Sequence, residues 1–177
     1  GNEGEEKAVK TYNYDFAGAS IKTTTSLTYT ADTLTKSTTV KGVDGTVKKS
    51  ETFYTGNEGE EKAVKTYNYD FAGASIKTTT SLTYTADTLT KSTTVKGVDG
   101  TVKKSETFYT GNEGEEKAVK TYNYDFAGAS IKTTTSLTYT ADTLTKSTTV
   151  KGVDGTVKKS ETFYTGNEGE EKAVKTY

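Results

Sequence analysis

Hydrophobic and polar side chains alternate most regularly along residues 19–30, and this alternation predicts a β-strand with one apolar face and one polar face. The apolar face would hold Ala19, Ile21, Thr23, Thr25, Leu27 and Tyr29. The polar face would hold Ser20, Lys22, Thr24, Ser26, Thr28 and Thr30.

Three further segments alternate less regularly, but they are rich in Thr, Val, Tyr and Phe, the residue types that suit a pleated, half-buried surface. They are Lys7 to Tyr14, Thr33 to Lys41 and Thr46 to Thr55, and with Ala19 to Thr30 they make four predicted strands. Leu and Ala are sparse and show no period of 3.6 residues, so no helix is predicted. The fold class expected from the sequence is therefore all-β.

Turn signals separate these strands at intervals of about 14 residues, the rhythm of an all-β fold. They lie at Gly1 to Gly4, at Asp15 to Gly18, around Ala31-Asp32 and at Gly42 to Gly45. Asp in first place and Gly in fourth place of Asp15 to Gly18 predict a type I turn. Asp44-Gly45 is a signal for a two-residue hairpin.

The same 55-residue sequence is repeated without a single change. The repeats are residues 1–55, 56–110 and 111–165, and residues 166–177 are a partial fourth repeat. Each repeat has few large apolar side chains, so a single repeat is expected not to fold alone. A tandem array is expected, in which each repeat covers the open sides of its neighbours, with a disordered chain as the alternative.

Two arrangements of the strands are compatible with the repeat. In a parallel β-helix every residue would stack on its own copy, so all the charged side chains would form unfavourable ladders of like charge. An antiparallel sheet of about four strands per repeat, wound into a spiral or tube by strand twist, places unlike residues side by side. Lys36 or Lys41 can then face Glu51, and Lys10 can approach Glu51 from the next repeat. The antiparallel arrangement is preferred, with the parallel β-helix as the alternative.

The pattern Y-x-Y-D-x-x-G occurs once in each repeat and resembles the core signature of YD-repeat (Rhs-type) proteins. The resemblance implies strands wound in an antiparallel spiral, within large secreted or surface-exposed bacterial proteins. The family's motif usually returns about every 20 residues, whereas here it returns every 55. The residues that carry the turn motif are Tyr12, Tyr14, Asp15 and Gly18, then Tyr67, Tyr69, Asp70 and Gly73, and then Tyr122, Tyr124, Asp125 and Gly128.

Several residue types are missing, and their absence narrows the chemistry. The chain has no His, Cys, Met, Trp, Pro, Arg or Gln, so the usual ligands of zinc, haem and iron–sulfur centres and the usual catalytic imidazole and thiol are lacking. No enzyme activity, metal or cofactor is expected. Each repeat is neutral and the chain carries −1 overall, so no nucleic-acid partner is expected. No apolar run approaches the roughly 18 residues of a transmembrane segment.

Other candidate sites have simpler interpretations. The loop Asn2 to Glu6 gathers three carboxylates that could hold Ca²⁺, but it is better interpreted as a solvated acidic turn balanced by Lys7 and Lys10. Thr-x-Thr triplets at 23–25, 28–30 and 33–35 resemble ice-binding faces, although they cluster in two strands only. Thr and Ser could carry O-linked glycans, and no N-glycosylation sequon is present.

These observations favour a structural protein, namely a segment of a long extracellular or cell-surface filament or stalk of microbial origin. Its partners would be neighbouring repeats or copies of itself in a fibril. The alternative is a multivalent adhesion array that binds glycan, ice or mineral surfaces. An engineered consensus repeat would also explain the identity of the copies. Because the sequence begins at Gly1 and stops within a predicted strand, an excerpt of a longer chain is expected.

Overall fold

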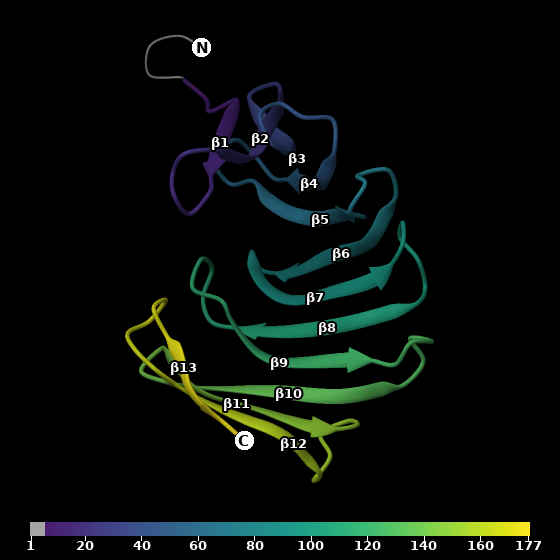
Figure 1. Ribbon diagram of the computed structural model, residues 1–177, viewed down its shortest axis with the longest axis vertical. Coiled ribbons are helices and arrows are strands. Elements are labelled where there is room, and N and C mark those ends of the chain that lie inside the picture. The colour runs from purple at the N-terminus through teal and green to yellow at the C-terminus, as the bar shows by residue number, and fades with distance from the viewer. Residues whose placement is uncertain (1–5) are drawn as a thin grey trace. The chain divides into compact units, whose positions relative to one another are not determined.

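The computed structural model describes residues 6–177, and it is built from strands alone (Figure 1). Thirteen strands follow one another in a single sheet in the order of the sequence, and none of the described residues forms a helix. The all-β prediction is confirmed. The predicted turn at Gly1 to Gly4 and most of the Asn2 to Glu6 loop lie outside the described residues, but later repeats show the equivalent segments.

The same strand pattern recurs at intervals of 55 residues. The first repeat contributes β1 (Lys10–Tyr14), β2 (Ile21–Thr30), β3 (Thr33–Lys41) and β4 (Lys48–Thr55). The second contributes β5 (Lys62–Tyr69), β6 (Ile76–Thr85), β7 (Thr88–Lys96) and β8 (Lys103–Thr110). The third contributes β9 (Lys117–Tyr124), β10 (Ile131–Thr140), β11 (Thr143–Lys151) and β12 (Lys158–Thr165), and β13 (Lys172–Thr176) belongs to the partial repeat.

Contacts between residues divide the chain into two compact units. The first extends to Ser81 and includes Gly97–Asp99, and the second comprises Leu82–Lys96 and Gly100–Tyr177. The boundary falls inside the second repeat. Each place where one repeat meets the next therefore lies within a single unit: β4 with β5 in the first unit, and β8 with β9 and β12 with β13 in the second.

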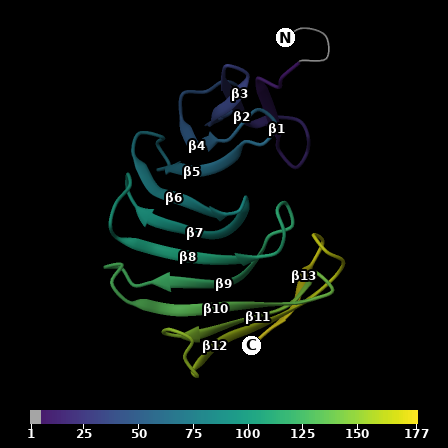
Figure 2. The same cartoon turned by 180° about the vertical axis from the view of Figure 1, so that it is seen from behind.

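Neighbouring strands pair antiparallel, as the registers within each unit show. Thr25 lies opposite Thr39 in the pairing of β2 with β3, and Thr52 lies opposite Thr66 in the pairing of β4 with β5. The alternative of a parallel β-helix is therefore wrong for the described strands. Figure 2 shows from behind how β8 to β12 run back and forth within the second unit.

The predicted strands and turns largely match the structure. β3 has the predicted bounds, while β2 and β4 each begin two residues later than predicted. β1 begins three residues late, but its equivalents β5 and β9 span the whole predicted segment. The type I turn is confirmed, because Gly18 N–H donates to the Asp15 carbonyl at 3.0 Å and neither Phe16 nor Ala17 has a positive φ.

The prediction of a two-residue hairpin at Asp44-Gly45 is wrong. β3 and β4 are joined by the six-residue loop 42–47, which the Lys41 N–H closes by donating to the Val47 carbonyl at 2.9 Å. The Thr24 hydroxyl holds this loop, because it donates to the Gly42 carbonyl at 2.7 Å and accepts from the Asp44 N–H at 3.0 Å.

The sheet has no conventional apolar core, since none of the hydrophobic side chains in residues 6–177 is fully buried. The side chains with no exposed surface are instead threonines, Thr24, Thr79 and Thr134. The sequence places Thr24 on the polar face of its strand, and loop 42–47 covers it there. The rest of β2 follows the prediction, with Lys22, Ser26, Thr28 and Thr30 exposed.

The two-residue turn between β2 and β3 is strained. Ala31 and Asp32 have φ of 45° and 68°, the left-handed conformation that a type I′ turn requires and that an Ala side chain disfavours. Ala31→Gly, together with the same change at Ala86 and Ala141, is expected to stabilise the fold by about 0.5–1 kcal/mol per site. Urea unfolding measures the gain. Ala17→Gly is the matched control, because φ of Ala17 is not positive, and it should stabilise nothing.

Candidate functional site

The first Tyr of the Y-x-Y-D-x-x-G motif joins two repeats. The ring of Tyr67, on β5, meets the ring of Phe53, on the preceding repeat's β4, edge-on with centroids 5.3 Å apart. Its hydroxyl donates to Asp99 Oδ2 at 3.1 Å. In the third repeat Tyr122 repeats both contacts, with Phe108 at 5.4 Å and Asp154 at 3.3 Å.

The second Tyr binds a carboxylate of the preceding repeat. The Tyr69 hydroxyl donates a short hydrogen bond to Glu51 Oε2, while the Lys48 ammonium lies 3.1 Å and the Lys36 ammonium 3.7 Å from Oε1. Only 11% of the Glu51 side chain is exposed. Tyr124 makes the same short hydrogen bond to Glu106. We name this arrangement of Tyr, Glu and two Lys the junction cluster.

The cluster favours the ionised form of its Glu. Burial alone would raise the pKa of Glu51, but the Tyr69 hydroxyl and the Lys48 ammonium outweigh burial and hold this pKa below its usual 4.5. Burial and the neighbouring carboxylate both raise the pKa of Tyr69 above 10.0. The hydrogen bond to Glu51 raises the pKa of Lys48 above 10.5. The cluster is therefore intact when Glu is ionised, Lys is charged and Tyr is neutral.

The Asp and Gly of the motif fold the turn back against the preceding repeat. Asp70 Oδ1 accepts the Ala74 N–H at 3.0 Å, and the Asp70 carbonyl accepts the Gly73 N–H at 3.1 Å. Gly73 has φ of 71°, and a Cβ on it would lie 2.5 Å from the backbone nitrogen of Lys48. Glycine is thus required at this position because the backbone is left-handed and because no room is left for a Cβ atom.

The motif in the first repeat shows the same turn without these contacts. Asp15 Oδ1 accepts the Ala19 N–H at 3.0 Å, but a Cβ on Gly18 would meet nothing within 4 Å. Tyr12 and Tyr14 are 41% and 56% exposed. The local sequence therefore makes the turn, and the neighbouring repeat makes the junction.

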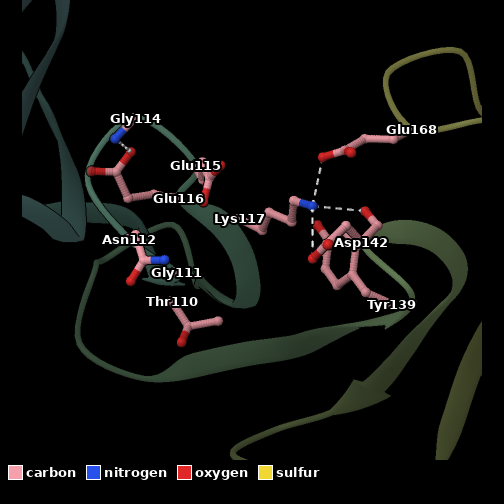
Figure 3. A pocket seen from close by; sticks show the side chains of 10 residues that line it. All are labelled: Thr110, Gly111, Asn112, Gly114, Glu115, Glu116, Lys117, Tyr139, Asp142 and Glu168. Atoms are coloured by element: carbon pink, nitrogen blue, oxygen red, sulfur yellow. Dashed lines mark hydrogen bonds and ion pairs between the residues drawn. The ribbon is translucent and has the colours of Figure 1, made fainter.

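A second set of contacts lies at the opposite ends of the strands, around a cleft of about 610 Å³ in the second unit (Figure 3). Lys117 occupies its centre, with its ammonium 2.6 Å from Glu168 Oε1 of the partial repeat and 3.1 Å from Asp142 Oδ1. It also lies over the Tyr139 ring, 6.0 Å from the centroid. In the first unit Lys7 makes the same ion pairs with Glu58 and Asp32.

The last Glu of the acidic loop ties its own repeat to the preceding one. Glu61 Oε1 accepts the Leu34 N–H of β3 at 2.9 Å, and Oε2 accepts the Gly59 N–H at 3.0 Å. These backbone donors, with Leu34 first, lower the pKa of Glu61 below 4.5. Glu171 binds Leu144 in the same way at 3.0 Å.

The predicted acidic turn at Asn2 to Glu6 lies almost wholly outside the described residues, and Lys7 pairs with Glu58 in the acidic loop of the next repeat. The Lys10 ammonium lies 2.8 Å from Asp44. The equivalent of Lys10 in the next repeat is Lys65, whose ammonium lies 2.9 Å from Asp99 and not beside Glu51, whereas the pairing of Lys36 with Glu51 is confirmed. Within residues 6–177, no group of acidic side chains is arranged to hold a metal ion.

Paired threonine hydroxyls were missed by sequence reasoning. Thr25 and Thr39 lie 2.9 Å apart across β2 and β3, and Thr52 and Thr66 lie 3.0 Å apart across the first junction. The signal was the abundance of Thr in every strand, but the pairs depend on strand register. Because these hydroxyls bond each other and Thr24 is buried, the triplet at 23–25 does not form an exposed threonine face.

The pKa directions predict how stability depends on pH. Glu51, Glu61 and Glu106 have lowered pKa values, so their contribution is present above about pH 4.5 and is lost as pH falls through the folded-state values. Lys48 and Tyr69 have raised values, so their contribution is lost as pH rises above about 10. Because the chain has no His, urea midpoints should be flat between about pH 6 and 9. A transition near pH 7 would contradict this assignment.

The chain matches no protein-family model and no curated protein. Among solved structures, a porin-like protein from Bacteroides uniformis is similar with a TM-score of 0.33 and 14% identity, over 94% of this chain and 87% of the other. No helix in the described residues is long and apolar enough to cross a membrane. The function of the chain is therefore inferred from its own residues.

Proposed function

We propose that the chain is a structural segment of a long extracellular or cell-surface filament or stalk. The observation that carries the proposal is the junction cluster, in which Tyr69 of one repeat completes the site of Glu51 in the repeat before it. Tyr124 and Glu106 repeat the arrangement. An array joined by identical contacts can be extended by any number of repeats, because every added repeat brings both halves of the cluster.

The finer architecture follows from the same contacts. We propose that the repeats form a tandem array wound into a spiral by normal strand twist. The contacts of the motif support the resemblance to YD-repeat proteins. Its two tyrosines bind the preceding repeat, its Asp holds the turn, and its Gly packs the turn on the preceding repeat. The motif is thus explained by structure alone, and we propose no catalytic role for it.

The proposed location outside the cell rests on the chemistry of the side chains. A chain without Cys or Met offers oxidants little to attack. Thr28 and Thr30 are exposed on β2, so the surface could carry O-linked glycans. A multivalent adhesion array remains the second interpretation of the same repeats, and it predicts that binding to a glycan or mineral surface rises far more than threefold from one repeat to three.

The axial repeat of the assembled protein tests the proposed function. Four strand spacings of about 4.8 Å give about 19 Å for each 55-residue repeat, which fibre diffraction or the power spectrum of electron micrographs would show. A repeat of one strand spacing per 55 residues would contradict the proposed array. Particles without any axial periodicity would equally overturn the filament.

A further inference from the structure

The connections between strands lie at two ends of the sheet, and each end has its own character. In the first unit the connections 15–20, 42–47 and 70–75 share one end, which we name the Phe end because two of them carry an exposed Phe. The connections 31–32 and 56–61 share the other, which we name the Glu end. In the second unit, Figure 1 shows β8 to β12 with their connections alternating between two ends of that unit.

The Glu end is acidic. Around the cleft of the second unit stand Glu115, Glu116, Asp142 and Glu168, with Lys117 as the cation among them. Counted within the third repeat, Glu113, Glu115, Glu116 and Asp142 together with Lys117 give this end a formal charge of −3. Glu115, Asp142 and Glu168 are exposed to solvent.

The Phe end is basic. Two aspartates of the first repeat, Asp15 and Asp44, lie in its connections. Five lysines lie beside these aspartates. The Lys10 ammonium pairs with Asp44, and the Lys22 carbonyl accepts the Gly42 N–H. Lys41 ends β3, and Lys48 and Lys49 begin β4. The formal charge is +3, so a neutral repeat is divided into two ends of opposite sign. Between the ends lies Glu51, which pairs with Lys36 at 3.7 Å and also with Lys48 of the Phe end at 3.1 Å.

The exposed Phe has no role within the sheet. Phe71 is 88% exposed and Phe126 92% exposed at the tips of their turns. Each ring meets a Lys of the preceding repeat, since the Lys41 ammonium lies 5.5 Å from the Phe71 centroid and the Lys96 ammonium 5.0 Å from that of Phe126. A ring and a cation thus project together from this end in the second and third repeats.

We infer that the Phe end of one copy docks against the Glu end of a second copy, so that filaments associate side by side. The charges of +3 and −3 recur with the same 55-residue period, and identical repeats therefore stay in register along the contact. Lys117 occupies the centre of the cleft beside Tyr139, so the Phe ring and its Lys would meet the exposed carboxylates of Glu115, Asp142 and Glu168 around it. Because the two docking surfaces differ, the contact does not close and produces bundles of many copies.

Complementary charge reversals test the docking. In one variant, Lys41, Lys96 and Lys151 are changed to Glu, and in the other Glu60, Glu115 and Glu170 are changed to Lys. These six side chains are exposed, so circular dichroism should show both variants folded. Light scattering and sedimentation velocity at low salt should show association of the unchanged chain, weaker by about tenfold or more in each variant.

Mixing the two variants distinguishes loss of docking from general loss of solubility. One substitution per repeat lowers the altered Phe end from +3 to +1 and the altered Glu end from −3 to −1. The first variant keeps its Glu end and the second keeps its Phe end, so the mixture should regain association through these unaltered ends. A mixture that stays monomeric would overturn the proposal, and so would an unchanged chain that stays monomeric at low salt. Association that survives about 1 M salt undiminished would contradict the electrostatic contact.

The contribution of the ring is tested separately. Phe16→Ser with Phe71→Ser and Phe126→Ser should weaken bundling while keeping its salt dependence. Val9→Ser with Val174→Ser is the matched control, because both Val side chains are exposed but lie outside the Phe-end connections, and it should leave bundling unchanged. Equal loss in both variants would show nonspecific apolar contact and contradict the docking. Single filaments that never bundle would likewise contradict it, while leaving the proposed function intact.

Discussion

Gly128→Ala is expected to destabilise the chain by about 2–5 kcal/mol, whereas Gly18→Ala should cost only about 1–2 kcal/mol. Both residues have a positive φ, so both substitutions lose stability by forcing an Ala side chain into the left-handed conformation. Gly128 additionally packs on the preceding repeat, where a Cβ would lie 2.5 Å from the Lys103 nitrogen and 2.9 Å from its carbonyl oxygen. Urea unfolding of the two variants measures the difference.

This pair isolates the junction, because the residues around Gly18 and Gly128 are identical in sequence. A larger loss at Gly128 can come only from the neighbouring repeat. Gly73→Ala should behave like Gly128→Ala, since Gly73 approaches Lys48 just as closely. Equal losses at all three glycines would show that the turn conformation alone requires glycine and that the close approach to the preceding repeat costs nothing.

Thr134→Val is expected to destabilise the chain by about 2–4 kcal/mol although it keeps the shape of the side chain. The Thr134 hydroxyl is fully buried, donates to the Gly152 carbonyl at 2.7 Å and accepts from the Asp154 N–H at 3.0 Å. Val would leave both backbone groups without this partner, at about 1–3 kcal/mol each. Hydrogen exchange in loop 152–157 should also become faster.

Two control variants separate the hydroxyl from the strand. Thr134→Ser keeps the hydroxyl and should lose only about 1 kcal/mol for the missing methyl group. Thr138→Val, at an exposed position of the same strand, should change stability by less than about 0.5 kcal/mol. If Thr134→Val were as mild as Thr138→Val, the buried hydroxyl would not hold the loop.

The local features of the fold could be predicted because they depend on neighbours in the sequence. The turn signals at Ala31-Asp32 and at Gly42 to Gly45 gave β3 its observed bounds, and Asp15 and Gly18 indicated their turn. The loop 42–47 was misjudged because Asp44-Gly45 satisfies the local rule for a short hairpin. Its longer form depends on a hydrogen bond to Thr24, 20 residues away along the chain.

The candidate site was predictable only in part, for the same reason. The spacing of Tyr67 and Tyr69 places both rings on one face of a strand, but their partners, Phe53 and Glu51, follow from the register of β4 against β5. Lys10 was assigned to Glu51 because opposite charge was the only guide available. The division of charge between strand ends could be found from the sequence once the strands were placed.

The dependence of stability on the number of repeats tests most directly the claim that repeats hold one another through their junctions. Chains of one, two, three and four repeats would be unfolded in urea under one set of conditions. A single repeat should be unfolded, and each further repeat should add an equal increment of free energy, because each adds one identical junction. A single repeat that folds on its own, with no gain from its neighbours, would contradict the claim.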